Sequence, residues 1–125
     1  MRTNLIITAF LGAITVILGA FGAHTLKETL NPEALEVFEI GVRYQMYHVL
    51  ALLLVNSTSY LTEKYKKRVS YLFFIGMLFF SGSIYAITGG IDFSNMWFIT
   101  PIGGTLLIVG WFVMLFGFIK SRHNS

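Results

Sequence analysis

The chain of 125 residues contains no cysteine, only two prolines and few charged residues. Without cysteine it has no disulfide, no thiol nucleophile and no thiolate metal site. Charged residues make up 12% of the chain, whereas a soluble domain carries about a quarter. The hydrophobic share is 55% and the mean hydropathy is +0.71. The composition therefore indicates an integral membrane protein.

Four stretches carry no charged residue at all, and they contain 24, 19, 23 and 27 residues. They lie between Arg2 and Lys27, between Arg43 and Glu63, between Arg68 and Asp92, and between Asp92 and Lys120. About 20 helical residues cross a hydrocarbon core about 30 Å thick, and charge is excluded from its middle. The sequence therefore predicts an all-α bundle of four transmembrane helices in one domain, over about residues 4–24, 43–61, 69–90 and 99–119.

Lysine and arginine are divided unequally between the two ends of this predicted bundle. With a cytoplasmic N-terminus, seven lie in cytoplasmic segments, and two, Lys27 and Arg43, lie on the opposite side. Positive residues concentrate in cytoplasmic loops, so we predict that both termini are cytoplasmic. The basic segment 63–68 is the main anchor, and such a segment can also bind anionic lipid headgroups. Positive charge at span ends gives no indication of nucleic-acid binding.

The first predicted span has two interpretations. Arg2, an apolar run, and small residues at Ala20 and Gly22 resemble a cleavable signal peptide. The apolar run covers residues 5–23, however, and is longer than a signal core of about 7–15 residues. Small residues also recur in it at four-residue spacing, which lets helices approach closely in lipid. We interpret it as a retained span.

The connection between the first two spans contains a helix start. Asn31 suits the N-cap, Pro32 the first helical position and Glu33 the positive end of the helix dipole. Apolar residues then repeat on one face, which predicts a short extracytoplasmic amphipathic helix of about three turns. Glu39 and Arg43 are spaced for an ion pair. The pattern leaves open whether this helix lies on the membrane surface or runs straight into the second span.

Polar residues from all four spans converge in the outer half of the predicted bundle. Ionisable residues inside a membrane protein are candidates for function. Amides, hydroxyls and histidines also hold helices together, at roughly 0.6 kcal/mol for each hydrogen bond. Two interpretations therefore stay open: a packing core, or an outward-facing pocket for a lipid headgroup, a solute or a proton. The predicted site residues are His24, Arg43, Gln45, Tyr47, His48, Ser81, Tyr85 and Thr100.

The leading prediction is a non-enzymatic protein that binds a membrane lipid, a small ligand or a membrane protein partner in this pocket. Arg43 would hold an anionic headgroup, and Gln45, Tyr47, His48 and Tyr85 would complete the lining. Glycine-rich faces favour a homo-oligomer. The alternative is a transporter or proton-coupled channel, acting as an oligomer, in which the imidazole titrates.

Catalytic and metal-binding patterns are weak in this chain. His24 and His48 with Glu39 lack the fixed local spacing of a zinc site. Ser81 or Ser83 could pair with the imidazole in a hydrolase, but the chain has no nucleophile-elbow motif and no carboxylate within the spans to orient that ring. We therefore favour a non-enzymatic protein and predict no metal and no cofactor.

Four ordered motifs stand out along the chain. They are Gly19–His24, Phe38-Glu39 with Gly41–His48, Phe80–Tyr85, and Ile99–Gly104 followed by Gly110-Trp111. With these motifs the chain resembles the domain-of-unknown-function-423 family of small four-span bacterial membrane proteins, which resembles the eukaryotic transmembrane protein 256. One departure is Trp97-Phe98, where a smaller residue would be expected. The resemblance implies an integral inner-membrane protein, and it implies no activity because the family has no established biochemical role.

Overall fold

The structure is a computed structural model that describes residues 2–92 and 97–121. Over these residues it is all helical and contains no strand. The first long helix is continuous from Arg2 to Leu26: α1 is followed by a short π-helical segment, η1, and then by α2. The elements are α1 (Arg2–Ile17), η1 (Leu18–Gly22), α2 (Ala23–Leu26), α3 (Pro32–Ser57), α4 (Glu63–Thr88) and α5 (Ile99–Ser121).

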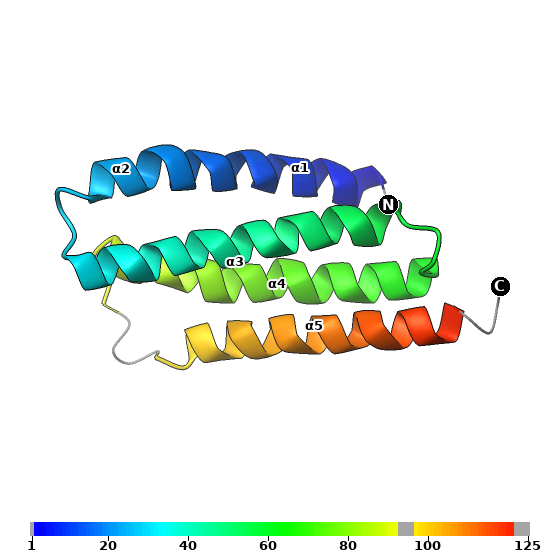
Figure 1. Ribbon diagram of the computed structural model, residues 1–125. Coiled ribbons are helices and arrows are strands. Elements are labelled where there is room, and N and C mark those ends of the chain that lie inside the picture. The colour runs from blue at the N-terminus through cyan, green and yellow to red at the C-terminus, as the bar shows by residue number, and fades with distance from the viewer. Residues whose placement is uncertain (1, 93–96, 122–125) are drawn as a thin grey trace.

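The long helices lie side by side and alternate in direction (Figure 1). Their main contacts follow the order of the sequence: α1 packs on α3, α3 on α4, and α4 on α5. Helices α1 and α5 lie on opposite sides of the α3–α4 pair (Figure 1). Helix α1 is therefore held mainly by one neighbour, along one side.

Helix α3 begins where the sequence predicts. Asn31 is its N-cap and accepts a hydrogen bond from the backbone N of Ala34 at 2.7 Å, and Pro32 takes the first helical position. The helix then runs unbroken to Ser57. Of the two arrangements that the sequence left open, the structure has the second: the amphipathic segment is the first part of α3 and runs straight on into the rest of that helix. No proline or turn interrupts it, and burial of its inward face already begins at Phe38.

Three helices of the described chain are long and apolar enough to cross a membrane: Arg2–Leu26, Glu63–Thr88 and Ile99–Ser121. By length and composition, three of the four expected spans are thus borne out. Helix α3 is as long as α4, at 26 residues, but it carries polar residues along its length. It nevertheless lies among the other long helices and runs beside them (Figure 1).

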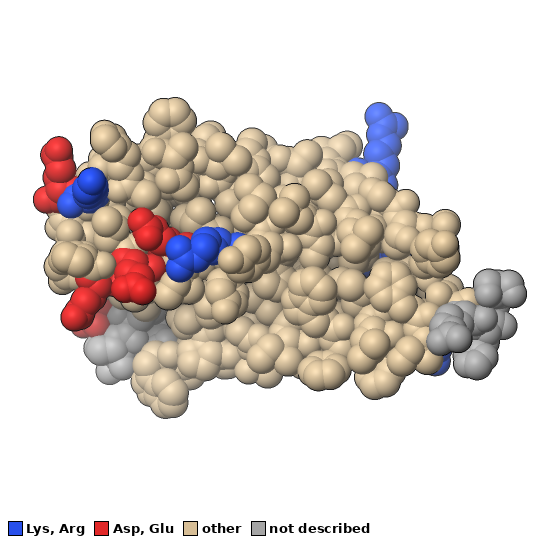
Figure 2. All heavy atoms as spheres, viewed as in Figure 1, with Lys and Arg blue, Asp and Glu red and all other residues tan. Residues whose placement is uncertain are grey.

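The two ends of the molecule differ in charge. The N-terminus, the α3–α4 connection and the end of α5 lie together at one end (Figure 1), which we call the basic end. Acidic side chains gather at the opposite, acidic end, around the start of α3 (Figure 2). The basic end carries Arg2, Lys64, Lys66, Lys67, Arg68 and Lys120. The acidic end carries Glu28, Glu33, Glu36, Glu39 and Asp92, with Lys27 and Arg43.

Glycines make the contact between α4 and α5 close. Gly103, Gly110 and Gly117 are buried on α5 and alternate with the buried Leu107 and Met114. This alternation of three-residue and four-residue steps is the seam pattern of coiled-coil packing. A Cβ atom added at any of the three glycines would come closer than 3.0 Å to an atom of a neighbouring residue. The α4–α5 pair is therefore the most closely fitted part of the molecule.

Candidate functional site

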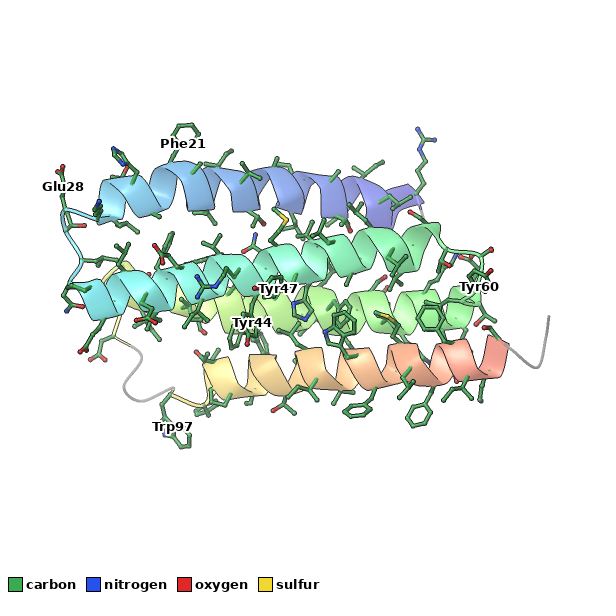
Figure 3. The ribbon with its side chains drawn as sticks, viewed as in Figure 1. Phe21, Glu28, Tyr44, Tyr47, Tyr60 and Trp97 are labelled. Atoms are coloured by element: carbon green, nitrogen blue, oxygen red, sulfur yellow. The ribbon has the colours of Figure 1, made fainter. Side chains whose placement is uncertain are left out.

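Three of the eight predicted site residues lie on the surface rather than in a shared pocket. His24, Arg43 and Tyr47 are all exposed, and Tyr47 exposes 53% of its surface (Figure 3). Among the residues that the structure describes, no ion pair joins Arg43 to Glu39, although the two are correctly spaced on α3. The structure therefore does not bring the guanidinium of Arg43 together with the buried polar groups of the predicted set.

Gln45 is the centre of a hydrogen-bonded chain across three helices, which we call the Gln45 chain. The hydroxyl of Tyr85 on α4 donates to Gln45 Oε1 at 2.7 Å, and Gln45 Nε2 donates to Thr15 Oγ1 on α1 at 2.7 Å. Thr15 in turn donates to the carbonyl oxygen of Leu11 at 2.7 Å. Gln45 and Thr15 are only 6% and 1% exposed. The chain ties α1 to α3 and α4 and engages both the oxygen and the nitrogen of the amide.

His48 faces a different side of α3, toward α4 and α5. Its Nδ1 lies 2.6 Å from the carbonyl oxygen of Tyr44, and because a carbonyl can only accept, Nδ1 carries the proton. Its Nε2 then accepts from the indole Nε1 of Trp111 at 3.0 Å. The ring packs edge-on against Phe73, with centroids 4.9 Å apart. Both nitrogens of the neutral ring are thus engaged, so neither is left for a metal or for proton transfer.

The other predicted residues join helices in pairs. Ser81 on α4 donates to the carbonyl oxygen of Gly41 on α3 at 2.8 Å, and Ser83 shares a hydrogen bond with Thr100 on α5. Both serine hydroxyls are engaged away from His48, so the geometry gives a Ser–His hydrolase no support. Over the described ranges, no group of three or more His, Asp or Glu side chains is placed to hold a metal ion.

A groove of about 570 Å³ runs between α1 and α4, and we call it the lateral groove. Gln45 and Tyr85 line it from α3 and α4, with their polar atoms engaged in the Gln45 chain. The rest of the lining is apolar or aromatic, and it opens sideways because residues on its walls, such as Leu78 at 67%, are exposed. The walls are Ile7, Leu11 and Ile14 from α1, Leu18 from η1, and Tyr71, Phe74, Met77, Leu78 and Gly82 from α4.

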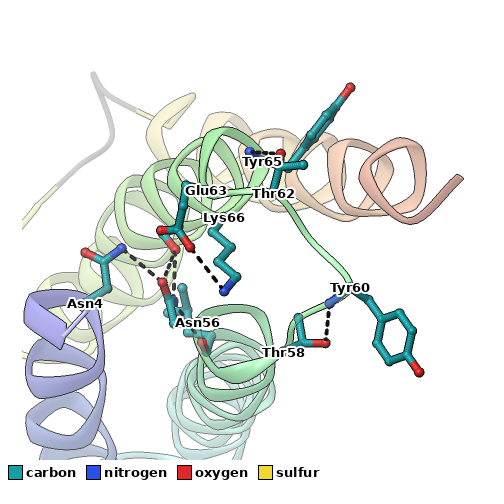
Figure 4. Close-up of polar contacts among 10 residues, drawn as sticks. Asn4, Asn56, Thr58, Tyr60, Thr62, Glu63, Tyr65 and Lys66 are labelled. Carbon is teal, nitrogen blue, oxygen red and sulfur yellow. Dashed lines mark hydrogen bonds and ion pairs between the residues drawn. The ribbon is translucent and has the colours of Figure 1, made fainter. Parts of the chain in front are cut away.

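A smaller pocket of about 230 Å³ adjoins the lateral groove at the basic end, and we call it the basic-end pocket. Asn4, Lys67, Ser70 and Tyr71 line it, and Tyr71 also lines the lateral groove. Asn56 on α3 holds its walls together (Figure 4). The amide of Asn4 donates to Asn56 Oδ1 at 3.1 Å, and Asn56 Nδ2 donates to Ser70 Oγ at 3.0 Å.

The lining of the basic-end pocket lies outside the eight predicted site residues, although Lys67 belongs to the basic segment 63–68. The available signal was the presence of amides and a hydroxyl near the inner ends of otherwise apolar spans, at Asn4, Asn56 and Ser70. Such groups need partners inside a membrane protein, so they mark places where helices meet. The binding role of the eight predicted site residues stays a prediction.

Three helices with the length and composition of membrane spans define this chain as a small helical membrane protein. The chain belongs to the DUF423 family of proteins of unknown function, whose model matches residues 18–104. The family indicated by the sequence motifs is thus confirmed. No solved structure matches the chain.

Several relatives match over nearly their whole length. A UPF0382 membrane protein of Haemophilus influenzae is 39% identical over 118 residues, which cover 94% of each chain. A UPF0382 membrane protein of Staphylococcus saprophyticus is 41% identical over 120 residues, covering 96% of this chain and 99% of the relative. The UPF0382 inner membrane protein YgdD of Escherichia coli K12 is 35% identical over 132 residues, covering 99% and 95%. These names describe membrane proteins and state no activity.

Proposed function

We propose that all four long helices cross the membrane, with α3 as the fourth span and both termini in the cytoplasm. The polar groups of α3 at Gln45, His48 and Asn56 are buried and bonded to neighbouring helices, so the lipid would not meet them. The basic end collects six lysines and arginines, which favours the cytoplasmic side for that end. The acidic start of α3 would then lie on the opposite side.

We infer that the protein binds one hydrocarbon chain of a membrane lipid in the lateral groove. The apolar walls and sideways opening of this groove carry the proposal. Its volume falls within the range of about 300–1,000 Å³ that is typical of ligand pockets. Tyr71 and Tyr85 line its two ends, and they are 14 positions apart on α4, which corresponds to about 21 Å of helix. One leaflet of the hydrocarbon core is about 15 Å thick, so the groove is long enough for an acyl chain.

The hydrogen bonding beside the groove also favours a lipid over a polar solute or a proton. The Gln45 chain engages the polar side-chain atoms of Gln45 and Tyr85 that face the groove, so a solute would meet mainly hydrocarbon walls, with the hydroxyl of Tyr71 at one end. The ring nitrogens of His48 are engaged on the other side of α3. A second ring proton there would face the indole N–H of Trp111 and break that hydrogen bond. No observation in the single chain therefore favours the transporter alternative.

The groove can be filled without disturbing the packing of the helices. A Cβ atom at Gly82 would meet only Leu78 Cδ1, at 3.8 Å, so a larger side chain at this position has room to enter the groove. Gly82→Leu is therefore the test variant. Ala13→Leu is its control, because Ala13 is exposed on α1 and does not line the groove.

The measurement is photo-crosslinking with phosphatidylglycerol that carries a diazirine in one acyl chain. The protein is reconstituted in vesicles that contain this lipid, and cross-linked peptides are mapped by mass spectrometry. We expect cross-links to concentrate on groove residues such as Phe74 and Met77, to fall several-fold in Gly82→Leu, and to persist in Ala13→Leu. Cross-links spread evenly over the lipid-facing surface, with no effect of Gly82→Leu, would refute the proposal.

A further inference from the structure

We propose that the basic-end pocket binds the phosphate of an anionic phospholipid whose acyl chain occupies the lateral groove. The inference rests on the proposed function, and it adds the headgroup, its charge and the leaflet. The ligand would be a phospholipid of the leaflet at the basic end, which is the cytoplasmic leaflet in the proposed orientation.

The α4 wall changes from apolar to basic along a single face. Lys67, Tyr71, Phe74 and Leu78 follow one another at steps of four, three and four residues, so they lie on one side of the helix. Tyr71 lines both cavities and marks the boundary between them. An acyl chain lying against the aromatic and aliphatic part of this face would place its headgroup beside the ammonium.

The α1 wall also changes at the basic end, from apolar to polar. Asn4 lies three and seven residues before Ile7 and Leu11, which line the lateral groove on the same helix face. Asn56 bonds the Asn4 amide and also Ser70 on α4, so the polar ends of both walls are held to one residue of α3. Polar groups from α1 and α4 therefore meet at the mouth of an apolar groove, which matches the polarity of a phospholipid.

The positive charge of Lys67 at the basic end of the groove favours an anionic headgroup. The exposed Lys67 forms no ion pair among the residues that the structure describes, whereas the neighbouring Lys66 is paired with Glu63 at 3.5 Å (Figure 4). A lysine ammonium binds phosphate as a point charge. Asn4 and Ser70 line the pocket beside it and are held in place by Asn56, so Lys67 is the group that would bind the phosphate.

The acidic end is a poorer place for the same headgroup. Arg43, which the sequence favours as the anion-binding residue, lines a cavity of about 190 Å³ together with Glu39. A carboxylate in that cavity repels a phosphate, and like charges in one site are unfavourable. The basic-end pocket contains no carboxylate among its lining residues. Charge complementarity therefore favours Lys67 over Arg43.

The test is a competition between two lipids, measured by native mass spectrometry of the full chain in mild detergent. Phosphatidylglycerol and phosphatidylcholine with identical acyl chains are added in equal amounts, and the ratio of the two bound lipids is read directly. We expect the wild type to prefer phosphatidylglycerol. Lys67→Gln should reduce that preference about fivefold, the effect of one lysine near an anionic headgroup. Lys67→Arg keeps the charge and should retain most of the preference.

Lys64→Gln is the matched control, because it removes the same charge from the same end while Lys64 lines neither cavity. An equal loss in both glutamine variants would indicate general attraction to the basic end and would overturn the headgroup site. Displacement of bound lipid by soluble glycerol phosphate would also overturn it, since a free phosphate would then suffice as ligand. Circular dichroism of each variant checks that it is folded.

The two proposals fail in different ways. Equal binding of both lipids, combined with a loss of binding in Gly82→Leu, would refute the headgroup site and leave the acyl-chain site standing. Lipid binding that is unaffected by Gly82→Leu would refute the groove itself, and the headgroup site with it.

Discussion

The contact between α4 and α5 gives a sharp quantitative prediction at Gly103. A Cβ atom added there would lie 2.8 Å from the backbone C of Phe79 and the Cα of Phe80, whereas ordinary contact begins at 3.4 Å. Helix α5 would therefore have to move away by at least 0.6 Å. The obstructing atoms belong to a helix backbone, so no side-chain rotation can relieve the clash.

The neighbouring Gly104 supplies the control. Its added Cβ would meet the ring of Phe80 at 3.6 Å, which is an ordinary contact. Both substitutions change the intrinsic helix propensity in the same way, by about 1 kcal/mol in soluble helices, so this contribution cancels between them. Overpacking of a well-packed interface costs about 1–3 kcal/mol. Because the clash at Gly103 is with backbone, we expect Gly103→Ala to be less stable than Gly104→Ala by about 2–3 kcal/mol.

The assay is reversible unfolding in dodecyl maltoside micelles to which increasing SDS is added, followed by circular dichroism. Wild type, Gly103→Ala and Gly104→Ala are compared by their free energies of unfolding. Equal values for the two variants, whether both lie near the wild type or both lie far below it, would contradict a clash that is specific to Gly103.

Two further substitutions test other parts of the structure. Gln45→Leu removes both hydrogen bonds of the buried amide and should lower the free energy of unfolding by about 1–2 kcal/mol, while Thr15→Val should cost about half as much. The same SDS titration measures both, and unchanged stability in Gln45→Leu would contradict the Gln45 chain. Asn31→Ala removes the N-cap of α3 and should destabilise that end by about 1 kcal/mol. Hydrogen exchange should then quicken in the first turn of α3 and stay unchanged near Ser57, and slow exchange throughout would refute the cap.

Features governed by large local energies could be predicted from the sequence. Charge-free runs predict the three helices that meet the criteria for a membrane span, because burying a charge in hydrocarbon is costly wherever it occurs. The start of α3 could be predicted because Asn31, Pro32 and Glu33 each act on the nearest helical turn. The continuation of the amphipathic segment into the rest of α3 could not be predicted, because it depends on packing against other helices.

The candidate site was harder to predict because depth in the membrane and direction around a helix are independent. The predicted spans place Gln45 and His48 at nearly the same depth in the membrane. The structure agrees, because the two residues are three apart on α3. Their directions depend on which helices lie on either side: Gln45 meets Thr15 on α1, and His48 meets Trp111 on α5. The sequence therefore predicts polar residues at one level, and only the packing order separates them into different contacts.

The glycine faces show the same difference: the sequence pattern reveals a contact face but not the helix that packs on it. Glycine-rich faces led to the prediction of a homo-oligomer, without a named partner helix. In the structure, Gly103, Gly110 and Gly117 of α5 face α4 and Leu61 of the α3–α4 connection within the same chain. Spacing identifies a face that another helix can approach closely, but it carries no information on which helix that is.

The polar residues of α3 have a consequence for how the protein is made. As the proposed fourth span, α3 carries Gln45, His48 and Asn56 and is too polar to be an apolar span on its own. Its partners are translated at different times: Thr15 precedes it, Ser70 follows shortly, and Trp111 comes 63 residues after His48. If helices are inserted one at a time, the free energy of inserting α3 is less favourable than that of the apolar helices. We therefore expect α3 to leave the translocon together with α4, as a helical hairpin, and to complete its hydrogen bonding only when α5 has been synthesised.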